Sequence, residues 1–260
     1  MNVCFKKPRI TKYFWLLQEL VTRDLRVKYR RSFLGYIWSV LNPLLMMVVL
    51  TIVFSNLFKF DIPNYPLYLL TGQILFNFYS DATIQSMNSI IYGASLIKKV
   101  YLPKYIFPVS RMLSSFVTMV FSLAALLIVM LATQAEFHAT LLLVPVVLLY
   151  FFLFTLGIGM ILSVLVVYFR DVEYLYSVFL TMFMYATPII YPMSIVPDWA
   201  EPVIAMNPMT TYVELFRQCV IYGEWPSLEM HLTCIFFSVL SLFLGIAVFE
   251  RHEKEFILYI

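Results

Sequence analysis

The residues of this 260-residue chain that could do chemistry form none of the groupings used by enzymes. No G-x-x-x-x-G-K-[ST] loop is present to hold nucleotide phosphates. The three histidines and three cysteines are spread along the chain at spacings that match no metal-binding motif. No His, Asp and Glu cluster of the kind that a proton relay needs lies in an apolar stretch. We therefore expect no catalytic residue, no metal and no cofactor in this chain.

Four groups of charged side chains remain as candidates for a function. Asp81 lies at the end of a long uncharged stretch. It could line or gate a path, but we favour a carboxylate bonded to a neighbouring helix. Arg217 could extend toward the membrane surface, pair with Glu214 or meet an anionic ligand. Arg170 and Asp171 could pair with each other, or cap the following helix. Lys98, Lys99 and Lys104 form a basic cluster.

The composition is that of a membrane protein with little mass outside the bilayer. Hydrophobic residues make up 62% of the chain, charged residues 13%, and mean hydropathy is +0.86. These values exclude a soluble enzyme, a disordered chain and a disulfide-rich scaffold. Six stretches without Asp, Glu, Lys or Arg are each long enough to span a bilayer as a helix, namely 32–58, 62–80, 112–135, 137–169, 174–197 and 230–249.

Basic residues predict the orientation of these six spans. With both termini in the cytoplasm, sixteen of the 18 Lys and Arg residues lie on the inner side, and only Lys59 and Arg217 lie outside. The net charge of +3 therefore reflects topology and lipid headgroups, and it does not indicate a nucleic-acid partner.

The predicted fold class is an all-α integral membrane protein with three parts. Residues 1–35 form a cytoplasmic, amphipathic interface segment, 36–250 a six-helix membrane domain and 251–260 a cytoplasmic tail. We expect spans at about 36–58, 67–91, 109–133, 141–169, 174–188 and 230–249. The second span carries many polar side chains and should face protein or water.

Two segments between the expected spans contain short helices according to their composition and length. Residues 93–108 are too short and too basic to span, and two prolines stiffen their exit, which predicts a short cytoplasmic helix followed by a rigid turn. Residues 191–229 contain five of the 13 prolines and two apolar pieces, 199–206 and 209–222. Pieces of this length favour re-entrant or interfacial helices at the outer mouth of a path.

Five motifs in order resemble one known family. They are RDLRVKYRRSFLGYIWSVLNPLL (23–45), LIKKVYLPKYIFP (96–108), FRDV (169–172), TPIIYP (187–192) and NPMT (207–210). Together they are similar to the membrane subunits of bacterial ABC exporters of polysaccharides and polyol phosphates, the ABC type-2 permease class. The resemblance covers nearly the whole chain, and its ordered motifs make it specific.

The resemblance implies a fold, partners and functional segments. The family has six membrane helices, an interface helix and re-entrant gate helices before the last span. Two copies form a pore, and two copies of a separate ATPase subunit bind beneath them and carry ATP and Mg²⁺. Residues 95–108 would be the helix that couples to the ATPase, and 10–32 would also contact it. The implied coupling residues are Arg23, Arg26, Ser95, Lys98, Lys99, Tyr101, Pro103, Lys104, Arg170 and Asp171.

The resemblance also implies a lipid-linked polysaccharide as cargo, exported across the bacterial cytoplasmic (inner) membrane. Aromatic residues make up 18% of the chain, and aromatic rings stack on sugars, although they also belong at membrane interfaces. The residues that we expect along the cargo path are Tyr36, Trp38, Asp81, Phe183, Tyr185 and Arg217. The alternatives are a permease for a small amphiphile or drug, and an ATP-independent channel or membrane enzyme. The residues do not distinguish among O-antigen, capsule and teichoic acid as cargo.

Overall fold

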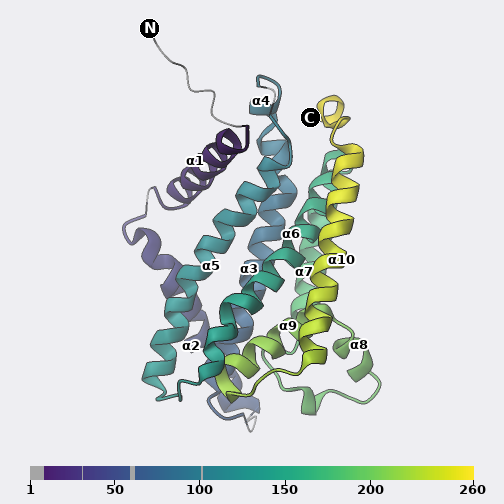
Figure 1. The fold of residues 1–260 in the computed structure, drawn as a ribbon. Helices are drawn as coiled ribbons and strands as arrows, with labels where there is room; N and C mark the ends of the chain where they lie inside the picture. The colour runs from purple at the N-terminus through teal and green to yellow at the C-terminus, as the bar shows by residue number, and fades with distance from the viewer. Residues whose placement is uncertain (1–8, 31, 59–61, 101) are drawn as a thin grey trace.

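The computed structural model describes residues 9–30, 32–58, 62–100 and 102–260, and within these ranges every regular element is helical. Long helices run side by side as an elongated bundle, and shorter helices lie at its two ends (Figure 1). The all-α prediction is confirmed.

Among the described residues, four helical segments are long and apolar enough to cross a membrane. They are Gly35–Phe54, which includes most of α2 (Trp38–Phe58), α5 (Ile106–Ala132), Ala139–Tyr168, which includes α6 (Val144–Tyr168), and α10 (Leu228–His252). Each coincides with a span expected from the sequence. The other two expected spans are α3 (Tyr65–Tyr92), which is long but rich in polar residues, and α7 (Val172–Tyr185), which has only 14 residues.

The most buried of the long helices is α3, and this position explains why it can be polar. It packs against α2, α5 and α6, and 20 of its 28 residues are buried. The hydroxyl groups of Thr71, Ser86 and Ser89 donate hydrogen bonds to backbone carbonyls inside the bundle. These three hydroxyls, which would be costly against lipid, are thus enclosed by protein, as the sequence predicted for this helix.

Helices α6 and α10 approach each other closely at glycine positions. A Cβ atom added to Gly157 would lie 2.2 Å from the backbone carbon of Ser241, and one added to Gly245 would lie 2.5 Å from the carbonyl oxygen of Gly157. No side chain fits between the two backbones here. Small residues allow this distance, which maximises dispersion contacts between helices in lipid.

Helix α1 (Arg9–Tyr29) lies at the same end of the bundle as α4 (Ala94–Ile97) and the C-terminal helix α11 (Phe256–Tyr259) (Figure 1). It is joined to α2 through the one-turn helix η1 (Gly35–Ile37). Gly35 has a φ of +51°, and nothing lies within 4 Å of the position of its missing Cβ. The left-handed backbone of this elbow, rather than crowding, therefore explains the glycine.

The opposite end is closed by short helices after α7. They are η3 (Met193–Ile195), α8 (Glu201–Ala205), α9 (Pro208–Arg217) and a π-helical turn, η4 (Gln218–Tyr222), and η2 (Ala139–Leu143) lies beside η4. The Asn207 side chain caps α9 by accepting a hydrogen bond of 2.9 Å from the backbone N–H of Met209. The two half-length helices expected within 191–229 are thus present as α8 and α9 with η4.

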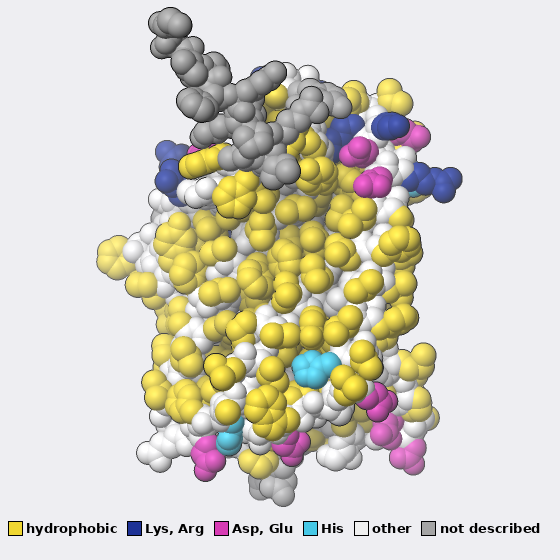
Figure 2. All heavy atoms as spheres, viewed as in Figure 1, with side chains coloured by type: hydrophobic (Ala, Val, Ile, Leu, Met, Phe, Trp, Pro, Cys, Tyr) yellow, Lys and Arg dark blue, Asp and Glu magenta, His cyan; other side chains and the backbone are white. Residues whose placement is uncertain are grey.

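Charge is divided between the ends of the molecule. Figure 2 shows a face covered by hydrophobic side chains, with Lys and Arg at the end that carries α1 and the C-terminus. At the other end of this face, Asp, Glu and His side chains are visible, and no dark blue side chain is. An apolar band between two polar ends is the surface that a bilayer requires.

Candidate coupling end and membrane cavity

The segment between α3 and α5 projects from the basic end of the bundle. Gly93 ends α3, and α4 then forms a single helical turn before the chain returns to α5. Ser95, Lys98 and Lys99 are exposed on this projection. Tyr101 lies outside the described residues. Lys98 and Lys99 follow α4 and are exposed, and the projection as a whole links α3 to α5. A movement of the projection can therefore reach both bundle helices.

Lys104 differs from Lys98 and Lys99 in its surroundings, because it hydrogen-bonds within the chain. Its Nζ donates a hydrogen bond to the backbone carbonyl of Glu253 and lies 5.6 Å from the centre of the Phe256 ring. Burial lowers the pKa of Lys104, while the Glu253 carboxylate raises it. Pro103 accepts a backbone hydrogen bond from Ile106 in the turn that starts α5. Lys104 therefore ties the C-terminal segment to the start of α5.

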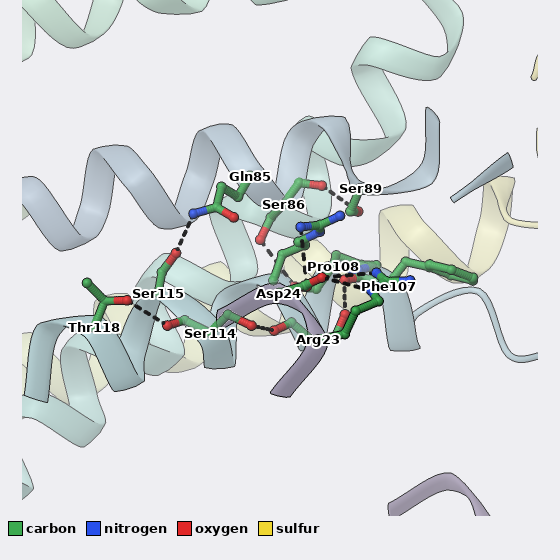
Figure 3. A network of polar contacts seen from close by, with 12 residues as sticks. Arg23, Asp24, Gln85, Ser86, Ser89, Phe107, Pro108, Ser114, Ser115 and Thr118 are labelled. Atoms are coloured by element: carbon green, nitrogen blue, oxygen red, sulfur yellow. Dashed lines mark hydrogen bonds and ion pairs between the residues drawn. The ribbon is translucent and has the colours of Figure 1, made fainter. Parts of the chain in front are cut away.

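Helix α1 is held to the bundle by two ion pairs one turn apart. Asp24 contacts Arg111 of α5 at 3.3 Å and its neighbour Arg23 at 3.0 Å, and it lies within a polar network of α1, α3 and α5 (Figure 3). Lys28 pairs with Asp81 of α3 at 3.3 Å. Residues at i and i+4 share a helix face, so one face of α1 makes both contacts. Arg26 is exposed on the remaining surface.

The two ion pairs differ in burial, so we expect them to contribute differently to the free energy of unfolding. The Asp24 side chain is 5% exposed, whereas Lys28 and Asp81 are 40% and 39% exposed. We expect Asp24→Asn to lower the free energy of unfolding by about 2 kcal/mol, because it leaves Arg111 without its buried counter-charge. Asp81→Asn is the control and should cost less than about 1 kcal/mol, since exposed pairs contribute little. Thermal unfolding of both variants in lipid nanodiscs measures the difference, and equal costs would contradict it.

A cavity of about 520 Å³, whose mostly apolar wall also carries polar side chains, lies between α2, α3 and α5, next to the Lys28–Asp81 pair. Trp38, at the start of α2, and Asp81 both line it, so the structure brings together these two residues of the expected cargo path. Asp81 also accepts hydrogen bonds from Gln85 at 2.9 Å and from Ser115 at 2.8 Å. The carboxylate is thus bonded to neighbouring helices, which is the interpretation that the sequence favoured.

The aromatic residues expected on the path are divided among three places. Tyr36 lies in η1, half-exposed, with its ring 4.8 Å from that of Tyr29. Phe183 packs inside the bundle against Tyr79, with ring centres 5.4 Å apart. Tyr185 is 65% exposed at the end of α7. These three side chains do not line the cavity that Trp38 and Asp81 share.

Arg217 is buried, with 1% of its surface exposed. Its guanidinium donates hydrogen bonds to the carbonyls of Pro188, Ile189 and Tyr68 at 2.8, 3.1 and 3.2 Å. It also lies 3.4 Å above the ring of Tyr68. Arg217 therefore binds α9 to α3 and to the segment after α7, and in this conformation its charge faces protein.

Arg170 and Asp171, at the turn between α6 and α7, are exposed. Asp171 occupies the N-cap position of α7, but its side chain makes no capping hydrogen bond. Within the described ranges the two residues form no ion pair with each other. The turn is closed instead by backbone hydrogen bonds, such as the one from Val172 to the carbonyl of Phe169.

Sequence reasoning left several cavity residues out of its list of sites. Gln73 and Asn77 of α3 and Asn42 of α2 line the cavity together with Lys28. Gln73, Asn77 and Asp81 recur at intervals of four along α3, which places them on one face. This spacing was the signal that could have found them.

Comparison with known proteins identifies the family. The model of the ABC-2 type transporter family matches residues 16–221, which is most of the chain. The chain belongs to the ABC-2 type transporter family. Members of this family are membrane permease subunits of ABC transporters, and ATP and Mg²⁺ belong to a separate ATPase subunit. The expectation of a membrane permease of this class is thereby confirmed.

Three relatives align with this chain over more than nine-tenths of its length. It is 31% identical to the O-antigen export system permease protein RfbA of Myxococcus xanthus, over 94% of this chain and 95% of the relative. It is 28% identical to the protein of the same name from Klebsiella pneumoniae, over 94% of each chain. It is 24% identical to the polysialic acid transport protein KpsM of Escherichia coli, over 92% of this chain and 93% of the relative.

Proposed function

We propose that this chain is the permease of an exporter that carries a lipid-linked polysaccharide, of the O-antigen, capsule or teichoic acid type, across the bacterial cytoplasmic membrane. The observation that carries this proposal is the end-to-end similarity to permeases named for O-antigen export and polysialic acid transport. Similarity over more than nine-tenths of each chain includes the segments at both ends of the bundle, so it extends beyond the apolar helices.

The proposed topology has six spans and both termini in the cytoplasm. Helices α3 and α7 would be the fifth and sixth spans, beside the four long apolar helices. Helix α3 is enclosed by other helices, and α7 is extended by the segment that follows it. The gathering of Lys and Arg at the end with α1 and the C-terminus supports a cytoplasmic location for that end (Figure 2). Helices α8 and α9 would then close the outer mouth as re-entrant gate helices.

The proposed assembly contains two permeases and two ATPase subunits. Only 17% of the apolar window in Gly35–Phe54 is buried within the chain, so α2 offers most of its surface to lipid or to a partner. Asn42 is exposed on that helix, and an amide is costly against lipid. A second copy that forms a path along α2 would shield it.

Energy for export would come from ATP bound to the partner. We assign the contact with the ATPase to the projection formed by Ser95, Lys98 and Lys99, and to the exposed residues of α1 and of the α6–α7 turn. Closure of the ATPase pair would then move α4, and with it α3 and α5, which α4 joins.

A charge reversal on the projection tests this assignment. We expect Lys98→Glu with Lys99→Glu to reduce recovery of the ATPase by at least tenfold when the permease is purified through a tag, since two ammonium groups facing the partner change sign. Arg251→Glu with Lys254→Glu is the matched control, because it makes the same change in charge at the same end. Equal recovery with both double variants would contradict the coupling role.

Deletion of the gene tests the function itself. A permease for polysaccharide export should be required for a glycan on the cell surface, and wild-type permease should restore it. Unchanged surface glycan would favour a small amphiphile as cargo. A purified, folded permease that never binds an ATPase would favour the channel instead.

A further inference from the structure

One polar group in the cavity between α2, α3 and α5 has no partner. Gln73 is 5% exposed, its side chain lines the cavity, and its Oε1 atom accepts no hydrogen bond from any described residue. A buried carbonyl oxygen without a donor is costly, so native proteins rarely keep one without a ligand, an ion or water to satisfy it. The cavity is where such a donor would enter.

Two more amides face the same space. Asn77 lies one turn from Gln73 on α3, and Asn42 lies opposite on α2. Both side chains are exposed and line the cavity, and no hydrogen bond joins either of them to another described residue. Three amides without partners on two helices leave both donors and acceptors unused at membrane depth. An amide presents an acceptor oxygen beside a donor NH₂, and a hydroxyl group offers the matching pair.

The charges and walls of the cavity define the ligand further. Lys28 and Asp81 are the two charged residues among its lining residues, and they neutralise each other at 3.3 Å, so the cavity has no net charge to attract an anion. Trp38, Phe76 and Met119 supply aromatic and apolar surface. A volume of about 520 Å³ lies within the range of small-molecule sites. An uncharged sugar, with hydroxyl edges and an apolar ring face, fits these features.

We propose that this cavity binds an uncharged sugar unit of the transported glycan, and that Gln73 Oε1 accepts a hydrogen bond from one of its hydroxyls. Asn77 and Asn42 hydrogen-bond to further hydroxyls, and Trp38 contacts the ring. This inference rests on the proposed function and adds to it a defined subsite, beside the interface helix and at the level of Asp81.

The test compares binding of a sugar with and without the Gln73 amide. The probe is the set of short oligosaccharides obtained by hydrolysis of the surface glycan that disappears when the gene is deleted. Binding to the complete transporter in lipid nanodiscs is measured by saturation-transfer NMR. We expect Gln73→Met to weaken binding about fivefold, which corresponds to the loss of one hydrogen bond. The same oligosaccharides after complete O-methylation, which removes every hydroxyl donor, should bind weakly to wild type and lose nothing further in Gln73→Met.

Controls separate a local effect from misfolding. Gln18→Met makes the same change at an exposed position of α1 and should bind as wild type does. Gln73→Glu keeps an acceptor at the same position and should retain more binding than Gln73→Met. Equal binding by wild type and Gln73→Met overturns the subsite, as does a wild-type transporter that exports the glycan but binds no oligosaccharide. If instead the proposed function is wrong, deletion of the gene leaves the surface glycan unchanged, and this result distinguishes that failure from failure of the subsite.

Discussion

Arg217→Met should lower the free energy of unfolding by about 3–5 kcal/mol. The substitution keeps a long side chain but removes the donors that reach the carbonyls of Pro188, Ile189 and Tyr68. Those oxygens lie in the interior of the bundle, where water does not replace the lost bonds. The face of the Tyr68 ring also loses the cation that lies 3.4 Å from its centre. Thermal unfolding of the purified permease in nanodiscs measures the change.

Two further arginine variants show whether the hydrogen bonds are responsible. Arg217→Lys keeps the positive charge but cannot bridge three carbonyls with a planar group, so its stability should fall between those of wild type and Arg217→Met. Arg170→Met removes an exposed arginine and should stay within about 0.5 kcal/mol of wild type. A loss below about 1 kcal/mol for Arg217→Met would show that the buried guanidinium does not hold this end of the bundle together.

The second large effect is expected from one methyl group between α6 and α10. Gly157→Ala places a Cβ atom 2.2 Å from the backbone carbon of Ser241, so the two helices must separate. Separation weakens the packing along both helices, and we expect a loss of about 3 kcal/mol or failure to accumulate in the membrane. Thermal unfolding measures the first outcome and immunodetection in membrane fractions the second.

Gly159→Ala is the matched control, since it makes the same change on the same helix two residues away. Its nearest atoms belong to side chains of Ser86 and Met112, at 2.9 and 3.1 Å, rather than to a backbone. The overlap at 2.9 Å is much smaller than the one at 2.2 Å, and the Met112 methyl group is at the end of a flexible side chain, so the cost should be smaller. If Gly159→Ala were as damaging as Gly157→Ala, crowding in general would explain the effect, and the approach of the α6 and α10 backbones would not.

The sequence predicted the elements well because hydrophobic length is a strong signal. Four long apolar stretches became four long helices, and the half-length pieces in 191–229 became α8 and α9 with η4. The amphipathic character of residues 1–35 indicated the interface segment in which α1 lies. These features depend on residues close together in the chain, so sequence reasoning can reach them.

The partners of individual side chains were harder to predict, because they depend on contacts between distant segments. Arg217 counted as an outward basic residue, yet it binds carbonyls of Tyr68 and Pro188, far away in sequence. Lys104 resembled Lys98 and Lys99, but the fold brings the C-terminal segment beside it. The polar positions of α3 were visible, but which of them face a cavity depends on how α2 and α5 pack.

The glycine elbow before α2 has a mechanical consequence. Helix α1 has 21 residues and is thus about 30 Å long, while its ion pairs at Asp24 and Lys28 lie in the third nearest the elbow. Leu20, one turn nearer the N-terminus than Asp24, is also buried, so α1 packs on the bundle over its second half and its first half forms a lever arm. A turn of about 10° around Gly35 would carry the far tip through roughly 5 Å, given that length, while the start of α2 hardly moves. A displacement imposed on the N-terminal tip of α1 would therefore produce a smaller displacement at the bundle, with a correspondingly greater force.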